Sequence, residues 1–230
     1  MSKYKYLLWD IDGTILDFES AEKAAIKTLF ERFNLGECSD EMIERYSKIN
    51  RKYWQMLERG EMSKEKILVE RFVEFFSKEG MDAGISDSFN REYQLALGDT
   101  IVFCDDAMDI IKEQKKKFEI VLVTNGTAVA QKKKLEKSGL QDIVNHIFIS
   151  EIVGYEKPDI NFFKKVISEF GINDLSEVLI IGDSLTSDIQ GGYNAGIDTC
   201  WYNPKGIKNE SSLSPTYIIQ NLHDLDSIVN

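Results

Sequence analysis

Short apolar runs separated by helical segments fill the second half of this chain. The runs cover residues 118–123, 146–149, 178–181, 197–201 and 217–219. Strands that alternate with helices indicate parallel βαβ units, in which a helix connects one parallel strand to the next. A further apolar run, residues 6–9, opens the chain. The sequence therefore predicts an α/β fold with a Rossmann-like, three-layer core built on a parallel sheet.

A helical block separates the first apolar run from the others. Ser20, Ser39 and Ser63 stand where N-caps would precede helices over residues 21–33, 40–58 and 64–78. The second and third of these helices carry apolar residues at helical spacing, among them Tyr46 and Phe72. We expect an all-helical cap domain over residues 18–99, inserted into a core domain formed by residues 1–17 and 100–230. The core resumes with a helix near residues 105–117.

Composition limits the classes of protein that this chain can belong to. Its 230 residues are 43% hydrophobic, enough for one large domain or two small ones at about 150 residues each. The net charge of −11, from 28 Lys+Arg and 39 Asp+Glu, argues against nucleic acid or an anionic membrane as the main partner. The lysine runs 115–117 and 132–134 are expected on solvated helix faces.

Two further observations concern the compartment. The three cysteines, Cys38, Cys104 and Cys200, are widely spaced and form no metal-ligand pairing, so we expect reduced core thiols. The N-terminus shows no secretory pattern, and no window approaches about eighteen consecutive apolar residues. We therefore expect a soluble, cytoplasmic protein with no membrane partner.

Polar residues stand where the core strands are predicted to end. Asp10 and Asp12 follow the first strand, residues 124–126 (Thr-Asn-Gly) follow the second, and Asp183 follows the fourth. Lys157 precedes a helix that begins near residue 160. Each motif alone is an ordinary turn or helix start. Together, at the edge where open α/β sheets bind ligands, they predict a site with crowded carboxylates that a cation would stabilise.

These motifs resemble those of the haloacid dehalogenase superfamily of phosphotransferases. The matches, in chain order, are residues 10–14 (Asp-Ile-Asp-Gly-Thr), 124–126, 157–158 (Lys-Pro) and 182–188. The resemblance spans residue 4 to about residue 225. The position of the cap and the run 57–63 look like the pyrimidine 5′-nucleotidase branch with a helical cap.

The resemblance implies a reaction on phosphate esters. It assigns to Asp10 the role of nucleophile, since a carboxylate can form an aspartyl phosphate and split one hard displacement into two easier ones. Asp12 would be the general acid and base. Thr124 and Lys157 would complete the catalytic set, and Thr124, Asn125 and Lys157 would bind the phosphoryl group.

The resemblance also implies a Mg²⁺ cofactor, which suits hard oxygen ligands and a phosphate substrate. Its ligands would be the carboxylates of Asp10 and Asp183 and the main-chain carbonyl of Asp12. Asp188 would hold Lys157 or a metal-bound water.

The resulting interpretation is a Mg²⁺-dependent phosphomonoester hydrolase for a small phosphorylated metabolite, with pyrimidine nucleoside 5′-monophosphates as the preferred substrates. Phe18, Tyr53 and Trp54 are candidates for stacking on a base, although helical spacing also predicts that Tyr53 and Trp54 pack inside the cap. A monomer and a loose homodimer are equally compatible with the sequence.

Several alternatives share part of this pattern. A phosphoglycolate phosphatase, or a sugar-phosphate phosphatase or mutase of the superfamily, keeps every motif. Dehalogenases of the superfamily lack an acidic residue at the place of Asp12. A signalling receiver has no helical block after its first strand. A catalytically silent binding protein of this fold should have lost Asp10, Asp12, Lys157 or Asp183, and all four are present.

Overall fold

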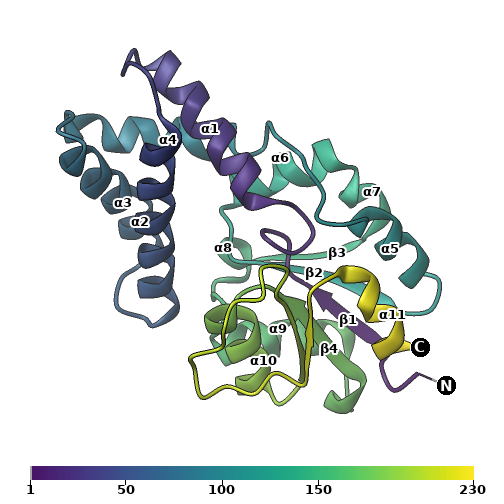
Figure 1. Cartoon of the computed structure of the whole chain (residues 1–230). Coiled ribbons are helices and arrows are strands. Elements are labelled where there is room, and N and C mark those ends of the chain that lie inside the picture. The colour runs from purple at the N-terminus through teal and green to yellow at the C-terminus, as the bar shows by residue number, and fades with distance from the viewer. Residues whose placement is uncertain (1) are drawn as a thin grey trace.

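A six-stranded parallel sheet with strand order β3-β2-β1-β4-β5-β6 forms the centre of the protein (Figure 1). The computed structural model describes residues 2–230. The strands are β1 (Tyr6–Trp9), β2 (Glu119–Thr124), β3 (His146–Ile149), β4 (Val178–Gly182), β5 (Asp198–Tyr202) and β6 (Tyr217–Ile219). Each predicted strand agrees with an observed one to within a residue at either end, and the predicted fold class is confirmed.

Helices cover both faces of the sheet, because alternate strand residues point to opposite sides. Leu7 and Trp9 of β1 belong to the buried cluster on one face, and Leu8 belongs to the cluster on the other. The first face is covered by α5 (Ala107–Gln114), α6 (Ala128–Ser138), α7 (Leu140–Ile143) and α11 (Leu225–Val229). The second is covered by α9 (Ile160–Phe170) and α10 (Gln190–Ala195), while the short α8 (Ser150–Val153) follows β3. Figure 1 shows the resulting three layers.

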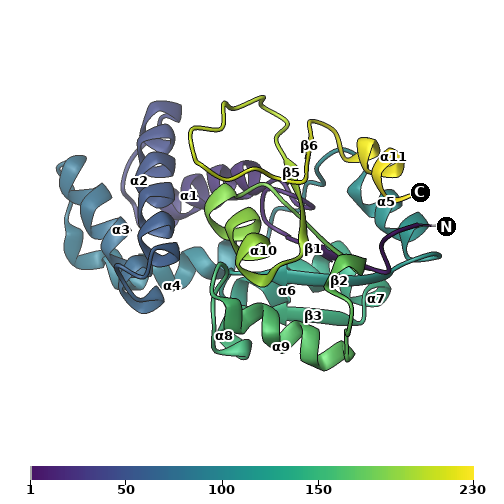
Figure 2. The same cartoon turned by 90° about the horizontal axis from the view of Figure 1, so that it is seen from below.

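Four helices form the cap, which lies to one side of the core while both termini lie on the opposite side (Figures 1 and 2). They are α1 (Phe18–Arg32), α2 (Asp40–Glu58), α3 (Lys64–Lys78) and α4 (Ser86–Ala96). Their shared core is rich in aromatic side chains. The ring of Phe72, for example, packs against those of Tyr46 and Phe89, with a centroid distance of 5.0 Å to each. This aromatic cluster gives the cap a hydrophobic core of its own.

The caps of the helices agree with the sequence in part. Ser39 caps α2 as expected and accepts a hydrogen bond from the N–H of Met42. The expected N-cap of α1, Ser20, is wrong: α1 begins three residues earlier, and the carboxylate of Asp17 accepts from the N–H of Ser20. Asp and Ser are equally good N-caps, so their preference alone could not separate the two positions. Ser63 precedes α3 but makes no side-chain capping bond.

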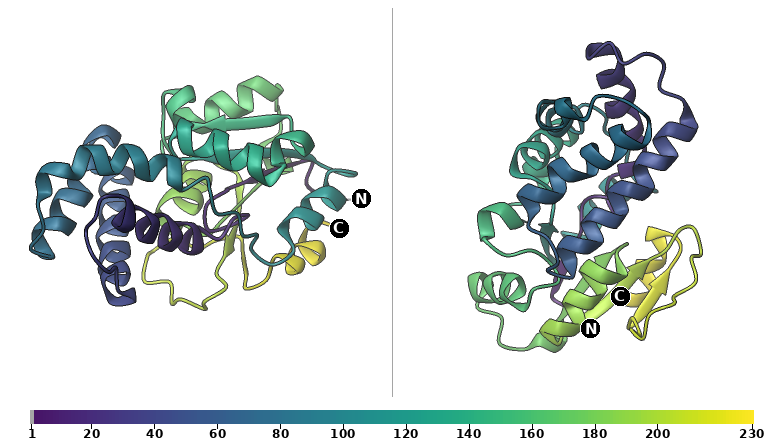
Figure 3. Two further views of the ribbon diagram at one scale, coloured as in Figure 1. Left: turned by 90° about the horizontal axis from the view of Figure 1, so that it is seen from above. Right: turned by 90° about the vertical axis from the view of Figure 1, so that its left-hand side faces the viewer.

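Two connecting segments join the cap to the core, and they run side by side. The N–H of Asp17 donates to the carbonyl of Val102 (2.8 Å), and the N–H of Cys104 donates to the carbonyl of Ile15 (2.9 Å). Both ends of the helical block therefore leave the core at one place, as the left-hand view of Figure 3 also shows. We propose residues 1–17 and 100–230 as the core domain and 18–99 as the cap domain.

Solvent exposure differs from the expectation at two places. Lys134 is only 2% exposed, although its neighbour Lys132 is open to solvent. All three cysteines are free, but only Cys200 is fully buried, while Cys38 and Cys104 are partly exposed. Within residues 2–230, no helix combines the length and the apolar character that crossing a membrane requires.

Candidate active site

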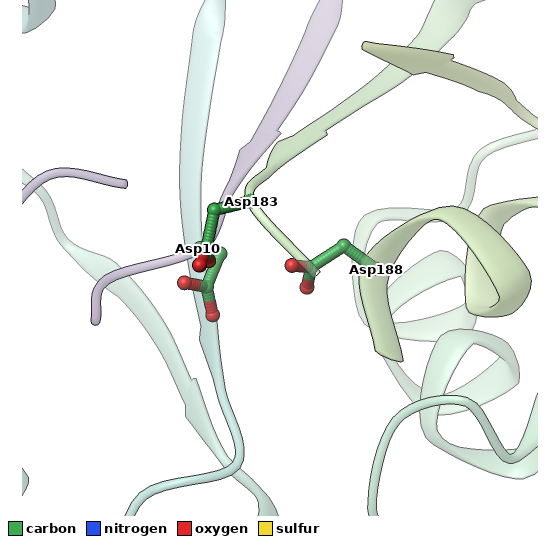
Figure 4. Close-up of side chains that lie close together, drawn as sticks. All are labelled: Asp10, Asp183 and Asp188. Carbon is green, nitrogen blue, oxygen red and sulfur yellow. The ribbon is translucent and has the colours of Figure 1, made fainter. Parts of the chain in front are cut away.

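Three adjacent parallel strands bring the predicted motifs to one edge of the sheet. β2, β1 and β4 end at Thr124, Trp9 and Gly182, so residues 124, 10 and 183 lie side by side. The single π-helical turn η3 (Leu185–Ile189) then turns Asp188 back toward them. Figure 4 shows the carboxylates of Asp10, Asp183 and Asp188 converging from these elements.

Lys157 connects this cluster to the sheet. Its side chain is 1% exposed, and its Nζ donates to Asp10 Oδ1 and Asp188 Oδ1, both at 2.6 Å, and to the carbonyl of Val123 at 3.0 Å. Burial lowers the pKa of Lys157, but the charges of Asp10 and Asp188 raise it overall. The lysine therefore stays positively charged beside two buried carboxylates.

The carboxylates outnumber the cation that offsets them. One oxygen from each of Asp10, Asp183 and Asp188 lies within 4.8 Å of the others. Burial raises the pKa of Asp10 well above its usual range, Lys157 opposes this, and the charges of Asp188 and Asp183 add to it.

Asp183 shows the same effect. The pKa of Asp183 is raised to about 7, most strongly by desolvation of its carboxyl group within the site and next by the charge of Asp188. Part of the residue is nevertheless open to solvent. Three carboxylates beside one lysine leave excess negative charge in a site of oxygen atoms. A hard divalent cation such as Mg²⁺ fits such a donor set.

Asn125 holds the main chain of Lys157. Its Nδ2 donates to the carbonyl of Lys157 (2.7 Å), and its Oδ1 accepts from the N–H of Lys157 (2.8 Å). The second amide hydrogen faces Ser187 Oγ at 3.3 Å. The side chain of Asn125 therefore bonds to the main chain of Lys157 and to Ser187, and its role as a phosphate-binding residue stays a prediction.

Thr124 is buried at the end of β2. Its Oγ1 accepts from the N–H of Gly126 at 3.0 Å, which leaves the hydroxyl hydrogen available as a donor. The predicted contact of Thr124 with a phosphoryl oxygen would use this hydrogen.

Asp12 is not one of the three clustered carboxylates. Its carboxylate is bonded by the ammonium group of Lys134 and by Nε2 of Gln131 (2.5 Å), both on α6. Lys134 was expected on a solvated face, and this contact with Asp12 explains its burial. A Cβ at residue 126 would lie 2.1 Å from Gln131 Nε2, so a larger residue there would displace the Gln131 side chain that bonds Asp12.

Sequence reasoning missed both partners of Asp12. Gln131 and Lys134 are three residues apart, on one face of the helix that follows the 124–126 motif. This spacing is the sequence signal from which both partners of Asp12 could have been predicted.

A small cavity lies between the cap and the core, next to Asp12. Phe18 and Trp54 line it, together with Arg71 and Gln94 of the cap. Its volume is about 20 Å³, room for about one water molecule. Tyr53 does not reach it: this side chain is buried in the cap, with the amine of Lys52 4.8 Å from its ring centroid. Sequence reasoning missed Arg71 and Gln94, which carried no motif.

Glu58, the last residue of α2, links the cap to the site. Its Oε2 accepts a hydrogen bond from Thr186 in the π-helical turn. The pKa of Glu58 is raised to about 7, mainly by burial. The hydrogen bond from Thr186 opposes this shift, and the charge of Asp188 adds to it. The contact places the end of the cap directly above η3.

This parallel sheet, with a carboxylate at the end of its first strand and a buried lysine against it, defines a hydrolase-type α/β site with an inserted cap. A sequence model of the haloacid dehalogenase-like hydrolases matches residues 7–202. The chain therefore belongs to this family, as its motifs predicted.

Relatives match the chain over nearly its whole length. It is 37% identical over 230 residues to the HAD-hydrolase YfnB of Bacillus subtilis (strain 168), a match that covers 100% of this chain and 97% of YfnB. It is 36% identical over 225 residues to the pyrimidine 5′-nucleotidase PynA of Streptococcus pneumoniae (strain ATCC BAA-255 / R6), covering 96% and 93%. It is 26% identical over 227 residues to the pyrimidine 5′-nucleotidase YjjG of Escherichia coli (strain K12), covering 99% and 98%.

A solved structure supports the same relationship. The crystal structure of YfnB bound to magnesium, which reveals interdomain movement, matches with a TM-score of 0.93 at 37% identity and covers 99% of each chain.

Proposed function

We propose that this hydrolase is a Mg²⁺-dependent phosphomonoesterase that acts through an aspartyl phosphate, with pyrimidine nucleoside 5′-monophosphates as substrates. The observation that carries the proposal is the contact of buried, charged Lys157 with Asp10 at the edge of the sheet. The names of PynA and YjjG, both pyrimidine 5′-nucleotidases, support the substrate class.

The first half of the reaction uses Asp10 as the nucleophile. One of its carboxylate oxygens attacks phosphorus, and the bond between phosphorus and the leaving oxygen breaks. Asp12 gives its proton to that oxygen, so a neutral alcohol departs. Lys157 and the hydroxyl of Thr124 stabilise the charge on the phosphoryl oxygens.

The second half releases phosphate. A water molecule attacks phosphorus while Asp12 takes one of its protons, and the bond from phosphorus to Asp10 breaks. Between the two halves Asp12 is a carboxylate, and the ammonium group of Lys134 contacts it.

The proposed Mg²⁺ would be held by the carboxylates of Asp10 and Asp183 and by the main-chain carbonyl of Asp12. It would neutralise charge between nucleophile and phosphoryl oxygens. The excess of carboxylates over cations in the site supports this, as does the magnesium in the structure of YfnB. Asp188 contacts Lys157 and accepts from the N–H of Ser184 (3.1 Å), so we propose that it positions Lys157.

A substrate panel tests the proposal. Phosphate release is measured with UMP, CMP, dTMP, phosphoglycolate and glucose 6-phosphate, each with Mg²⁺ and with excess chelator. We expect Mg²⁺-dependent turnover and the highest kcat/KM for the pyrimidine nucleotides. Full turnover in chelator would refute the metal assignment. A tenfold preference for phosphoglycolate or the hexose phosphate, roughly 1.4 kcal/mol, would refute the nucleotidase assignment and leave the phosphatase.

Two variants separate the roles of the aspartates. Asp10→Asn removes the nucleophile, so no acid-stable, alkali-labile phosphoenzyme should form from labelled substrate. Asp12→Asn keeps the nucleophile and should still allow some phosphorylation of Asp10 by an aryl phosphate, whose leaving group needs little protonation. Identical behaviour of the two variants with an aryl phosphate would contradict the assignment.

A further inference from the structure

A buried guanidinium in the cap faces the cavity beside Asp12. Arg71 of α3 is 1% exposed and lines this cavity. Its side chain donates to Asn50 Oδ1 (2.6 Å), to Asn90 Oδ1 (3.2 Å) and to the carbonyl of Leu68 (3.2 Å). A guanidinium has five N–H donors, so two of them make none of these bonds. No carboxylate among residues 2–230 is in direct contact with it.

The charges around the cavity are already balanced. Glu22 is buried and accepts from Nδ2 of Asn50 at 2.8 Å, so it offsets Arg71 through one intervening amide. Asp12 is paired with Lys134. A second anionic group on the ligand would therefore add an unbalanced buried charge, which is costly. The cavity suits an uncharged group.

Amide side chains complete its polar wall. Gln94 donates to Asn90 Oδ1 (3.0 Å) and accepts from the hydroxyl of Thr127 (2.8 Å). Gln131 is 1% exposed, and its Oε1 has no hydrogen-bond partner in the part of the chain that the structure describes. A buried acceptor without a donor is unusual and here points to a ligand that supplies one.

The aromatic side chains of Phe18 and Trp54 also line the cavity, and the ammonium group of Lys134 lies 5.3 Å from the ring centroid of Phe18. An aromatic side chain can stack on a planar ring, whereas a sugar or a short acid has none to stack. Asp12 fixes the orientation of the ligand in the cavity, because the leaving oxygen of the substrate has to lie next to the Asp12 carboxylate. Gln131, bonded to Asp12, is therefore near the sugar end, and Arg71 is farther into the cap.

We propose that this cavity is the subsite for a pyrimidine nucleoside, with Arg71 as the residue that recognises a ring carbonyl of the base. Gln131 Oε1 accepts from a sugar hydroxyl, and Phe18 and Trp54 flank the base. The inference rests on the proposed function and deepens it. The cavity is smaller than a nucleoside, so the cap has to move away from α6 for the substrate to enter.

The test compares three substrates on the unaltered protein: UMP, ribose 5-phosphate, and the 5′-phosphate of a phenyl C-riboside, which is flat but has no carbonyl. We expect kcat/KM to be highest for UMP, by roughly tenfold or more over each of the others. Mg²⁺-dependent turnover with UMP no better than ribose 5-phosphate would refute the base subsite. Failure of all three to release phosphate would instead refute the proposed function.

Variants then assign the recognition to Arg71. In Arg71→Met, kcat/KM for UMP should fall roughly 10- to 100-fold, because a hydrogen bond to a charged group is lost. Ribose 5-phosphate should change by less than about threefold. Arg71→Lys keeps the positive charge, so the same comparison of UMP with ribose 5-phosphate is made on this variant if Arg71→Met fails to fold.

Lys64→Met is the matched control. Lys64 is a second buried cation of the cap, and it contacts Ser150 and Glu156 of the core instead of the cavity. This variant should change both substrates by the same factor. Equal losses for UMP and ribose 5-phosphate in the folded Arg71 variants would show that Arg71 only stabilises the cap, and would overturn the inference.

Discussion

Replacing Lys157 with methionine tests how the charges of the site are balanced. Methionine has a similar length but no charge, so Lys157→Met leaves Asp10 and Asp188 without the ammonium that contacts both at 2.6 Å. Both carboxylates are buried, with Asp10 only 6% exposed. Removing one partner of a buried ion pair costs about 3–5 kcal/mol. For a chain of this size that corresponds to a fall in Tm of about 6–20 °C.

The destabilisation should depend on pH. Burial already raises the pKa of Asp10 in the folded protein, and losing Lys157 removes the charge that opposes this shift. A carboxyl whose pKa is raised by folding adds stability below its unfolded pKa of about 3.9 and loses that contribution as pH rises through the folded pKa. The gap in unfolding free energy between variant and unaltered protein should therefore be small near pH 4–5 and full near pH 8.

Urea unfolding in chelator at about pH 5 and pH 8 measures this gap. Lys165→Met, which removes an exposed lysine of α9, is the control and should change stability by less than about 0.5 kcal/mol. Adding Mg²⁺ at the higher pH should restore part of the loss, because a cation again balances the carboxylates. A loss below about 1 kcal/mol at pH 8, or one that is equal at both pH values, would refute the reasoning.

Three further predictions concern the neighbouring residues. The affinity for Mg²⁺, measured by calorimetry without substrate, should fall as pH drops below about 7, because protons compete for Asp183; an affinity that is constant from about pH 5.5 to 8 would contradict this. Lys134→Met should lower kcat for nucleotides by roughly tenfold or more but spare an aryl phosphate, since Lys134 acts through Asp12; equal losses would point to a structural role. Gly182→Ala should destabilise the fold by about 1–3 kcal/mol and reduce activity, because the new Cβ would lie 2.2 Å from the carboxylate of Asp188; a fully active, equally stable variant would show that Asp188 can move freely.

The core could be predicted from the sequence because its strands are buried on both faces. Such strands appear as continuous apolar runs, and β4 and β5 were found to within a residue on that basis. The residues at the strand ends follow from the same pattern, since parallel strands bring their carboxyl ends to one edge. Asp10, Thr124 and Asp183 were therefore predictable as neighbours.

The partners contributed by helices could not be predicted in the same way. Arg71 and Lys134 are charged residues on amphipathic helices, and such residues usually face solvent. Arg71 is buried where α3 packs against α2 and α4, and Lys134 is buried where it contacts Asp12, which the pattern of either segment alone does not show. The sequence pattern of a helix identifies the face toward its own core, but it does not say which other domain covers the opposite face.

The paired connections between cap and core lie at different distances along the chain from the two aspartates that we propose as catalytic. Asp10 is anchored in the sheet, where its N–H donates to the carbonyl of Ile181 at 2.9 Å. Asp12 lies a few residues before Asp17, in the segment that leads into the first connection to the cap, and its carboxylate is held to the core by Gln131 and Lys134 of α6. A rotation of the cap about the paired connections would therefore reach the proposed proton donor through a short length of main chain, while the sheet holds the proposed nucleophile. On the proposed mechanism, the bonds from α6 would keep Asp12 in register with Asp10 when the cap moves to admit the substrate.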